Sequence, residues 1–389
     1  MEHLYQELKL WEDEHDPLSE EERLNAVIRP LCLWYKGCRR ELPWRSDANP
    51  YRIWISEIML QQTRVEAVKP YFMRFMEQIP DIAALADVSE ENLLKLWEGL
   101  GYYSRARNLK KAAEICVRQY DGRLPQTYEE LLLLPGIGSY TAGAIASIAY
   151  GQRKPAVDGN VLRVLHRVLA SRDDILQAKV KKSLEVRLEA SMNRVNADAG
   201  IYNQALMELG ACVCIPNGEP LCKDCPLSGI CLAHRHGITE EIPYRPKKKA
   251  RKIENRTVCV VTDGECFVIR KRPDKGLLAG MYELPSESGR LSCEDAERIW
   301  GERLEDTVCA VKTEPGKHVF SHVEWHMDGL EIRTKRHLSE YQSRLKYLGY
   351  LIVTKKQLRE QFPIPSAFSS WKGYYQMEKD KCGGEGDER

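Results

Sequence analysis

The chain has 389 residues, and its 58 Lys and Arg residues nearly balance its 57 Asp and Glu residues, giving a formal net charge of +1. This length predicts two domains, because single domains cluster at about 100 to 200 residues. The charge balance excludes a basic field over the whole molecule. The start of the chain is acidic, unlike a signal peptide, and no stretch approaches the roughly 18 apolar residues of a membrane span. We therefore expect a soluble protein without a membrane partner.

The first part of the chain predicts a helical domain at 23–240, preceded by an acidic extension at 1–22. The extension carries nine Asp or Glu residues against one Lys. From Leu24 onward, apolar residues such as Val27 recur at helical spacing, and similar stripes continue through residue 210. The pattern favours an all-α domain.

Residues 131–150, LLLLPGIGSYTAGAIASIAY, predict two helices joined by a tight turn, which is a helix-hairpin-helix. Gly136 and Gly138 permit the backbone conformations of such a turn and leave the amides at the start of the second helix uncovered. Uncovered amides at a helix N-terminus bind phosphate. A plain turn between two helices stays open as an alternative for this motif alone, because short glycine-rich turns are common.

Asp158 lies twenty positions after Gly138, in the sequence VDGN, and directly precedes an apolar helical stretch with Val161 and Leu165. An acidic residue at the start of a helix is most often a cap. Taken alone, this residue predicts a capping role.

Four cysteines in the middle of the chain, Cys214, Cys222, Cys225 and Cys231, predict a metal site. Their spacing includes a C-x-x-C core, which suits four thiolates converging on one iron–sulfur cluster or one zinc ion, with disulfide or core cysteines as the alternative. The other nine cysteines show no pairing pattern, which indicates a reducing, cytoplasmic compartment. These nine are Cys32, Cys38, Cys116, Cys212, Cys259, Cys266, Cys293, Cys309 and Cys382.

The segment 241–256, EIPYRPKKKARKIENR, predicts a solvated basic linker, since it holds two prolines, seven Lys or Arg residues and little to bury. Short strand-like runs and two helical stretches follow, so 257–380 is expected to be a smaller α+β domain. The strands are expected at 257–262, 266–269, 308–312, 319–327 and 350–353, and the helices at 292–302 and 355–361. The glycine-rich, charged end at 381–389 predicts a disordered tail.

At this point the chain resembles a known family, the helix-hairpin-helix DNA glycosylases that carry a [4Fe-4S] cluster, and among them the MutY-type adenine DNA glycosylases. The resemblance covers nearly the whole chain and rests on these segments: LPWR at 42–45, WISEIMLQQTRVEAVKPYF at 54–72, EGLGYYSRARNL at 98–109, LPGIGSYTAGAI at 134–145, VDGNVLRVL at 157–165 and the four cysteines. It implies two helical subdomains with a DNA groove between them, and a [4Fe-4S] cluster held by the four cysteines. Family members commonly leave six residues between the first two ligands, whereas Cys214 and Cys222 leave seven. Zinc stays open from the spacing alone.

The resemblance implies that three residues break the bond between adenine and deoxyribose. Glu57 matches the family's catalytic glutamate, expected to protonate the base, and Asp158 matches the carboxylate that stabilises an oxocarbenium-like sugar. The apolar neighbours Trp54 and Ile58 predict a raised pKa for the Glu57 carboxyl. Tyr140, expected to position the sugar, takes the place of a lysine that forms a Schiff base in bifunctional relatives, so the chain looks monofunctional. Without the resemblance, an ion-paired glutamate, a helix cap and a packed tyrosine are the plainer interpretations.

Other residues match family positions that hold the flipped adenine or invade the duplex. A base inside a duplex is out of reach, so it must be rotated out, and protruding turns then fill the gap. Arg45 and Gln204 match the adenine pocket, where an amide can both donate to and accept from the base; for Arg45, ordinary surface polarity is the alternative. The two expected turns supply Gln61, Gln62, Thr63, Leu100 and Tyr102.

The second domain resembles a Nudix-like fold, because GLLAGMYELP at 276–285 looks like the start of a Nudix box. The acidic helix with which a Nudix hydrolase holds magnesium is missing from its continuation. Phe320, Ser321 and His322 match the loop with which the family contacts 8-oxoguanine. This domain is therefore expected to recognise the damaged base.

Together these features predict a monomeric, monofunctional DNA glycosylase of base excision repair, which removes adenine opposite 8-oxoguanine or guanine in double-stranded DNA. In a bacterium, the expected location is the nucleoid region of the cytoplasm. Three alternatives stay open: an endonuclease III-like glycosylase and lyase for oxidised pyrimidines, a nucleotide-sanitising Nudix hydrolase with a DNA-binding appendage, and a non-catalytic DNA-binding module. Tyr140 and the C-terminal domain argue against the first, and the presence of both Glu57 and Asp158 argues against the last.

Overall fold

The computed structural model describes residues 18–244, 246 and 250–375. Contacts divide the chain into two compact units, the first formed by Met1–Asp87 and Asn108–Lys248, and the second by Val88–Arg107 and Lys249–Arg389. Most of the predicted acidic extension and the whole predicted tail at 381–389 lie outside the described residues. Along the described part of the chain, no helix is both long and apolar enough to cross a membrane.

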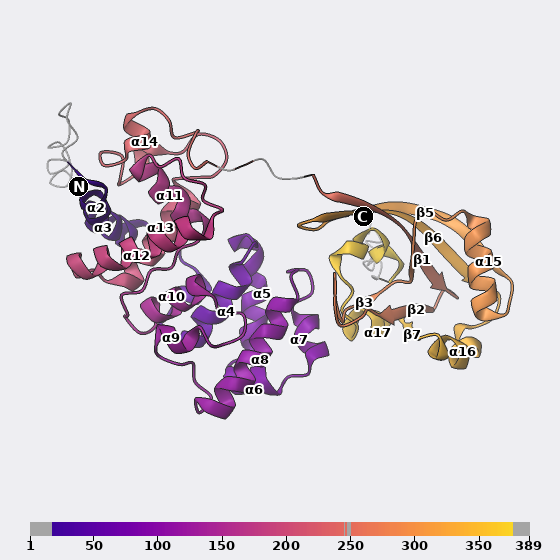
Figure 1. Ribbon diagram of the computed structural model, residues 1–389. Helices are drawn as coiled ribbons and strands as arrows, with labels where there is room; N and C mark the ends of the chain where they lie inside the picture. The colour runs from indigo at the N-terminus through magenta and orange to yellow at the C-terminus, as the bar shows by residue number, and fades with distance from the viewer. Residues whose placement is uncertain (1–17, 245, 247–249, 376–389) are drawn as a thin grey trace, which may run out of the picture. The chain divides into compact units, whose positions relative to one another are not determined.

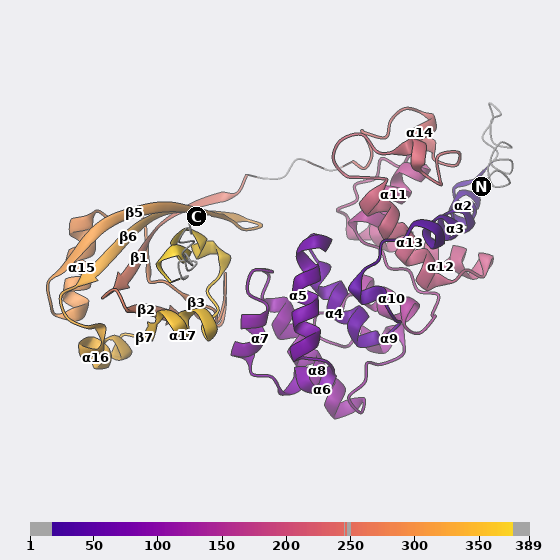
Figure 2. The ribbon, with the colours of Figure 1, turned by 180° about the vertical axis from the view of Figure 1, so that it is seen from behind.

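The first unit is built of helices. They are α2 (Glu20–Ala26), α3 (Ile28–Cys38), η2 (Pro43–Arg45), α4 (Pro50–Leu60), α5 (Val65–Gln78), α6 (Ile82–Asp87), α9 (Tyr128–Leu131), α10 (Ser139–Ile148), α11 (Gly159–Leu169), α12 (Ala178–Val195), α13 (Ala199–Cys212), η3 (Cys222–Asp224) and α14 (Leu232–Arg235), with α8 (Ser104–Gln119) continuing into this unit from the second. Figures 1 and 2 show α2, α3 and α11–α14 gathered together, beside a group that contains α4, α5, α9 and α10. The all-α prediction for this part of the chain is confirmed.

The N-terminal stripe of apolar residues lies in the core of the first unit. Leu24 and Val27 are fully buried and belong to one apolar cluster with residues of α11, α12 and α13. The stripe spans two helices rather than one, because α2 ends at Ala26 and α3 begins at Ile28. Ser19 begins α2 with a capping box, in which its side chain and that of Glu22 each accept a backbone N–H of the other. The last residues of the predicted extension therefore form the first turn of a helix.

The predicted helix-hairpin-helix is formed by α9 and α10, and its two glycines serve different purposes. Gly136 has a φ of +80°, a left-handed conformation in which a Cβ would also lie 2.7 Å from the Asn108 Cβ. Gly138 is the extended N-cap of α10, with open space where a side chain would lie. Conformational freedom is therefore needed at Gly136, whereas Gly138 leaves the first amides of α10 uncovered.

The second unit contains helix α7 (Glu90–Leu96) and a seven-stranded sheet. Its other elements are β1 (Lys252–Thr262), β2 (Cys266–Lys271), β3 (Tyr282–Glu283), β4 (Ser286–Ser288), α15 (Cys293–Leu304), β5 (Val308–Val319), β6 (Val323–Thr334), η4 (Leu338–Tyr341), α16 (Gln342–Tyr347), β7 (Tyr350–Thr354), α17 (Lys355–Glu360) and η5 (Ser366–Tyr374). The strand order is β3-β2-β1-β6-β5, with β4 paired to β1 and β7 paired to β2. Strand β1 runs parallel to β6, and the other pairings are antiparallel.

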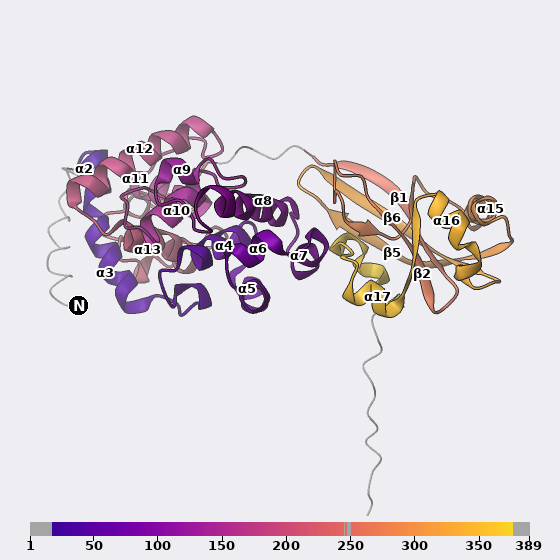
Figure 3. The same cartoon turned by 90° about the horizontal axis from the view of Figure 1, so that it is seen from below.

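Each face of this sheet is covered by its own helices, which can be followed in Figure 3. One apolar cluster joins the sheet to α15 and α16 and includes the fully buried Trp300 and Leu345. The other joins it to α17 and η5 and includes the fully buried Phe368 and Trp371. Burial alternates along most of β6, as expected for a strand whose successive side chains point to opposite faces. The α+β prediction is confirmed.

Two local predictions for this unit differ from the structure. The strand expected at 319–327 is interrupted, because β5 ends at Val319 and β6 begins at Val323. The connector expected through residue 256 is shorter, because β1 begins at Lys252 and pairs with β6 along its length. Ladder hydrogen bonds join backbone groups, so a basic sequence with few apolar side chains can still start a strand.

Candidate active site

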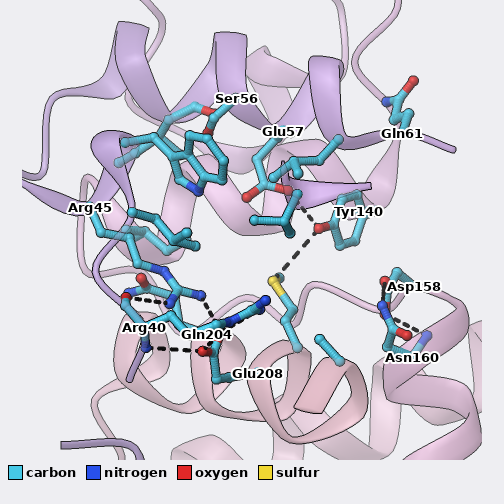
Figure 4. A pocket seen from close by; sticks show the side chains of 18 of the residues that line it. Arg40, Arg45, Ser56, Glu57, Gln61, Tyr140, Asp158, Asn160, Gln204 and Glu208 are labelled. Atoms are coloured by element: carbon cyan, nitrogen blue, oxygen red, sulfur yellow. Dashed lines mark hydrogen bonds and ion pairs between the residues drawn. The ribbon is translucent and has the colours of Figure 1, made fainter. Parts of the chain in front are cut away.

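A cavity of about 780 Å³ opens in the first unit, lined by residues of η2, α4, α10, the start of α11 and α13. It brings together eight of the residues predicted for the site: Arg45, Glu57, Gln61, Gln62, Thr63, Tyr140, Asp158 and Gln204. Figure 4 shows Glu57 and Tyr140 on one wall, Arg40, Arg45, Gln204 and Glu208 on the facing wall, and Asp158 and Asn160 to one side. Residues far apart in the sequence therefore converge on one hollow.

Glu57 lies on α4, a helix that begins with the Asn49 side chain accepting two backbone N–H groups and with Pro50 in its first turn. Its apolar neighbours Trp54 and Ile58 are buried, and the Glu57 residue is only 7% exposed. Burial, with a smaller contribution from the charge of Asp158, raises the pKa of the Glu57 carboxyl to about 7. The raised pKa predicted from the apolar surroundings thus appears in the structure, with the expected physical cause.

Tyr140 lies in the first turn of α10, directly after the hairpin. Its hydroxyl donates to Oε2 of Glu57 at 2.5 Å and lies 3.6 Å from Sδ of Met207. Burial and the neighbouring Glu57 and Asp158 carboxyls raise the pKa of the phenol well above its usual value. The phenol therefore stays protonated and acts as a hydrogen-bond donor to Glu57 at neutral pH.

Asp158 is the N-cap of α11, as its position in the sequence predicts. Its Oδ1 accepts the backbone N–H groups of Asn160 and Val161, each at 2.8 Å, and its Oδ2 accepts the Asn160 side-chain amide at 2.8 Å. Burial raises the pKa of this carboxyl, while the three hydrogen bonds oppose the rise by stabilising the ionised form. The Asp158 side chain therefore both caps α11 and lines the cavity.

The facing wall holds a buried charged group that the sequence did not indicate. Glu208 is 2% exposed and accepts hydrogen bonds from the guanidinium groups of Arg40, at 2.7 and 3.0 Å, and of Arg45, at 2.8 Å. Burial favours its neutral form, but the bonds to the two arginines outweigh burial and lower the pKa of Glu208 to about 2. Glu208 therefore holds Arg45 in the cavity as part of an ionised group.

Gln204 lies one turn before Glu208 on α13. Its Oε1 accepts the hydroxyl of Tyr35 at 2.9 Å, and its Nε2 donates to the carbonyl of Gly200 at 3.1 Å. A primary amide has two N–H groups and two acceptor lone pairs, so one of each remains for a ligand. The side chain is thereby fixed in orientation and still able to recognise the edge of a base.

The residues after α4 form an exposed turn at the mouth of the cavity. Gln62 is exposed and has a φ of +57°, which is unusual for a residue with a side chain. The backbone N–H of Thr63 donates to the carbonyl of Leu60 at 3.2 Å and closes the turn. The backbone thus holds Gln62 outward, as expected for a residue predicted to invade a duplex.

In the second unit, the predicted contact residues line a cavity of about 420 Å³, to which Leu100, Tyr102, Phe320 and Ser321 contribute. Tyr102 is half exposed with a φ of +47°, whereas Leu100 is buried, so Tyr102 is the protruding side chain of its turn. The Phe320 ring packs edge-on against Trp325, with centroids 4.9 Å apart. Ser321 and His322 are exposed, and Oγ of Ser321 lies 3.1 Å from Nδ1 of His322.

The four predicted ligand cysteines line one small cavity, and none of the four forms a disulfide. Burial raises the pKa of Cys225 to about 12 and that of Cys231 to about 11. Among the described residues, no three or more His, Cys, Asp or Glu side chains stand as close together as the ligands of one metal ion. Four sulfurs around one hollow are nevertheless the donor set that iron–sulfur clusters use, so the residues present suit such a group.

Two arginines of α11 contact the first of these cysteines. Nη1 of Arg167 lies 3.2 Å from Sγ of Cys214, and Nε of Arg163 donates to the Cys214 carbonyl at 2.8 Å. Nη2 of Arg163 also donates to Oδ1 of Asn160 at 2.9 Å, and Asn160 in turn donates to Asp158. A continuous run of hydrogen bonds therefore connects the Asp158 carboxylate with the cysteine loop.

Sequence reasoning missed several residues of this site, namely Tyr35, Arg40, Asn160, Met207 and Glu208. Glu208 lies four positions after Gln204, the spacing that places two residues on one face of a helix. That spacing is the one local signal that would have indicated Glu208. Its partner Arg40 is 168 positions away, so nothing local in the sequence connects the two.

Two segments of the chain match known families. Residues 55–190 match the HhH-GPD superfamily of base excision DNA repair proteins, a stretch that includes Glu57, Tyr140 and Asp158. Residues 257–370 match the NUDIX domain, a stretch that includes Phe320, Ser321 and most of the second-unit sheet. The two matches together include parts of both units.

Curated relatives extend this similarity. The chain is 36% identical over 359 residues to the adenine DNA glycosylase of Rattus norvegicus, an alignment that covers 77% of this chain and 69% of the rat protein. It is 30% identical over 344 residues to the adenine DNA glycosylase of Buchnera aphidicola, covering 87% of this chain and 95% of that protein. The alignments span 69%, 61% and 58% of the length of three mammalian relatives, from rat, mouse and human.

A solved structure supports the fold. The helical part is similar to a thermostable thymine-DNA glycosylase, with a TM-score of 0.50 and 26% identity, over 55% of this chain and 98% of that one. The similarity therefore covers about half of this chain and nearly all of the solved protein.

Proposed function

Because the chain belongs to the adenine DNA glycosylase family, we propose that it hydrolyses the N-glycosidic bond of adenine mispaired with 8-oxoguanine or guanine in duplex DNA. The Glu57 carboxyl supports this activity most directly. It is buried in a cavity and its pKa is raised to about 7. Departure of adenine as a neutral base requires a proton donor of this kind.

Glu57 acts as the general acid. A carboxyl with a pKa near 7 is about half protonated at neutral pH, whereas an ordinary glutamate is almost fully ionised. The Tyr140 hydroxyl donates to Oε2, so the transferable proton is carried on the other carboxyl oxygen, Oε1. This proton passes to a ring nitrogen of adenine as the bond to the sugar breaks.

Asp158 stabilises the cationic sugar that the departing base leaves behind. Its hydrogen bonds from two backbone amides and the Asn160 side chain favour the ionised carboxylate, and so does the N-terminus of α11. Water then adds to the anomeric carbon and passes a proton to the Glu57 carboxylate, which lost its own proton to adenine, and this completes the hydrolysis. One carboxyl gives a proton while the other supplies negative charge.

The reaction ends at the abasic site without strand cleavage. A lyase forms a Schiff base between a primary amine and the sugar, and the residues that line the cavity, all of them within the described part of the chain, include no lysine. Tyr140 offers a phenol at the hairpin position instead. The cavity is therefore suited to hydrolysis by water.

Recognition of the flipped adenine falls to Gln204 and Arg45. The remaining amide donor and acceptor of Gln204 suit the edge of adenine, which itself presents a donor beside an acceptor. Arg45 adds N–H donors from a guanidinium whose orientation is fixed by Glu208. Gln61, Gln62 and Thr63 contact the DNA around the vacated space, and Tyr102 of the second unit also contacts DNA.

The four cysteines hold a [4Fe-4S] cluster. When bound, the group would join Cys214, just after α13, to the loop that carries the other three cysteines, and would leave no open position for substrate. Arg167 would place an N–H donor beside one ligating sulfur. Brown colour and about four iron atoms per purified chain would support this assignment, and Cys225→Ser should remove most of both; zinc without iron would contradict it.

Cleavage of the glycosidic bond and recognition of the damaged base belong to different domains. We assign 23–240 to the glycosylase domain, 241–251 to a basic linker and the chain from Lys252 onward to a domain that recognises 8-oxoguanine. Ser321 supports this assignment, because its exposed hydroxyl can both donate to and accept from the altered edge of the damaged base. The protein acts as a monomer on double-stranded DNA.

The experiment compares single-turnover cleavage of duplexes with 8-oxoguanine:adenine, guanine:adenine, 8-oxoguanine:cytosine and thymine glycol:adenine pairs. We expect alkali-labile sites at the adenine of the first two duplexes, faster in the first, and none in the others. Absence of such a site opposite 8-oxoguanine would refute the proposed function. Ser321→Ala should reduce the preference for 8-oxoguanine over guanine and leave the reaction at guanine:adenine intact.

Two further assays decide between the proposed function and other activities. Borohydride trapping of a covalent protein–DNA adduct would favour an endonuclease III-like lyase. Release of pyrophosphate from oxidised dGTP would favour a Nudix hydrolase. We expect neither product.

A further inference from the structure

A buried asparagine, Asn203, lies where three elements of the cavity meet. It is on α13 and only 1% exposed. Its neighbour Gln204 lines the cavity, whereas Asn203 does not. A buried polar side chain costs free energy unless its hydrogen bonds are made, so its partners show what it holds in place.

The Asn203 amide makes three hydrogen bonds. Oδ1 accepts the backbone N–H of Ala156 at 3.0 Å, while Nδ2 donates to the carbonyl of Lys154 at 2.9 Å and to Oγ of Ser147 at 2.8 Å. Both kinds of group on the amide are therefore used, and its orientation is fixed. The bonds reach two segments that are distant from Asn203 in the sequence.

Each of the connected segments carries a residue of the proposed reaction. Ser147 belongs to α10, whose first turn contains Tyr140. The segment 154–156 leads directly into Asp158, only two positions after its last residue. Asn203 itself is adjacent to Gln204. A single side chain therefore joins the three elements that carry Tyr140, Asp158 and Gln204.

Two glycines show how closely these elements approach one another. A Cβ at Gly143 of α10 would lie 2.1 Å from the Pro155 carbonyl oxygen, and a Cβ at Gly200 of α13 would lie 2.8 Å from the Ser147 carbonyl oxygen. Backbone therefore meets backbone where α10 contacts both of the other elements. A closely packed junction has little room to adjust, so displacement of one element moves its neighbours.

We propose that Asn203 is a positioning residue, which fixes the Asp158 carboxylate relative to Glu57 and Tyr140 through its hydrogen bonds to Ala156, Lys154 and Ser147. This role rests on the proposed glycosylase activity. Asn203 does not touch the substrate, and its effect on the reaction passes through the residues it holds.

Loss of this junction would change the acidity of Glu57 as well as the rate. The Glu57 carboxyl faces Tyr140 from α10, Asp158 from the start of α11 and Arg45 from η2. The charge of Asp158 raises the pKa of Glu57, so movement of Asp158 away from Glu57 lowers that pKa. The alkaline limb of the pH–rate profile then shifts to lower pH.

The test compares Asn203→Asp with Asn193→Asp in the full-length protein. Asn203→Asp keeps the shape of the side chain but removes both N–H donors, whereas Asn193 is an exposed residue of α12 and provides a matched control. We expect Asn203→Asp to reduce the single-turnover rate, corrected for the active fraction, by about 10- to 100-fold and to shift the alkaline limb downward. Affinity for a duplex with a non-hydrolysable 2′-fluoro-deoxyadenosine opposite 8-oxoguanine should stay within about twofold.

Ser147→Ala provides a milder variant, because it removes one of the three bonds and leaves the segment 154–156 attached. It should reduce the rate several-fold by loosening α10, and because Asp158 keeps its position the alkaline limb should not move to lower pH. A several-fold slower rate decides the matter if Asn203→Asp does not fold. An unchanged rate and pH profile in the folded variants would overturn the positioning role. So would a loss of rate fully explained by a lower active fraction. If wild-type protein releases no adenine, the glycosylase proposal itself has failed.

Discussion

Two buried glutamates face the same cavity from opposite walls and have opposite acidities. Glu57 on α4 is 7% exposed and its pKa is about 7, whereas Glu208 on α13 is 2% exposed and its pKa is about 2. Burial raises the pKa of both carboxyls. They differ in their partners, because Glu57 accepts a phenol, while Glu208 accepts the guanidinium groups of Arg40 and Arg45.

The comparison shows that the partner, not the degree of burial, decides what a buried carboxyl can do. The α4 wall keeps a proton available for transfer at neutral pH. The α13 wall keeps its carboxyl permanently ionised, which orients cationic donors for recognition. The proposed chemistry and the proposed base selection therefore lie on separate walls, and the following changes should affect one without the other.

The largest effect is expected from Glu57→Gln. The amide preserves the acceptor for Tyr140 but has no transferable proton, so the single-turnover rate should fall by about 10²- to 10⁴-fold, the usual contribution of a general acid. Glu77→Gln, an exposed glutamate of α5, is the matched control and should retain wild-type kinetics. A Glu57→Gln rate within twofold of wild type would remove Glu57 from the chemistry.

Removing the charge on the other wall should mainly reduce stability and selectivity. Glu208→Gln leaves two guanidinium groups without their carboxylate, and breaking a buried pair costs about 3 to 5 kcal/mol of unfolding free energy. Urea denaturation would measure this loss. Glu283→Gln is the matched control, since Glu283 is 1% exposed and paired with Arg270 and Arg272 in the second unit.

The two substitutions should differ in their effect on base selection. Glu208→Gln should reduce the preference for adenine over purine analogues opposite 8-oxoguanine, because Arg45 loses its fixed orientation. Glu283→Gln should cost stability and keep that preference. Equal selectivity in both variants would show that the Glu208 wall is merely structural.

The raised pKa of Glu57 should also affect stability in a pH-dependent way. Its folded pKa of about 7 exceeds the reference value of 4.5, so between these values the folded state binds more protons than the unfolded state. Stability therefore falls as pH rises from about 4.5 to 7, by roughly 3 kcal/mol in total. Glu57→Gln should lose this dependence, so its advantage in thermal stability over wild type should be greater at pH 8 than at pH 5. An equal difference in thermal stability between Glu57→Gln and wild type at pH 5 and pH 8 would contradict the raised pKa of Glu57.

A tenfold effect per pH unit is expected on the rate. The acid must be protonated, so the single-turnover rate should decrease about tenfold per unit above pH 7. The Tyr140 hydrogen bond lowers the pKa of Glu57, so Tyr140→Phe should move this alkaline limb to higher pH. The hydroxyl of Tyr150 donates to the Leu124 carbonyl outside the cavity, so the control variant Tyr150→Phe should leave the limb in place. A limb at the same pH in Tyr140→Phe would exclude the coupling.

The smallest effect is expected from Tyr35→Phe. It removes one hydrogen bond to Gln204, worth about 1 kcal/mol, and should weaken product inhibition by free adenine about fivefold while the pH profile stays unchanged. Tyr341→Phe, which removes a hydroxyl bonded to Asp306 in the second unit, is the control. A shifted pH profile in Tyr35→Phe would mean that the two walls are not independent.

The features that local sequence predicted are those carried by local patterns. The stripe from Leu24 indicated helices, the apolar neighbours of Glu57 indicated a shifted carboxyl, and the position of Asp158 indicated a cap. Each depends on residues within a few positions of one another. The structure shows all three with the physical causes that these patterns imply.

What local sequence could not predict depends on contacts between distant segments. Arg40 and Glu208 are separated by 168 positions, and Asn203 reaches Ala156 across 47. The prediction of one strand through 319–327 was wrong for a related reason. Alternation of side chains does not reveal where one strand ends and the chain reverses into the next. Pairing of strands and ion pairs between helices are fixed only when the chain has folded.

The left-handed backbone at Gln62 and Tyr102 has a consequence for protein engineering. Each conformation costs about 1 to 2 kcal/mol for a residue with a side chain, so glycine at either position should make the free protein more heat-resistant. A selection for thermal tolerance alone would therefore accept these changes early. It would also discard the side chains that we propose contact the DNA, and the more heat-resistant protein would then be a poorer repair enzyme.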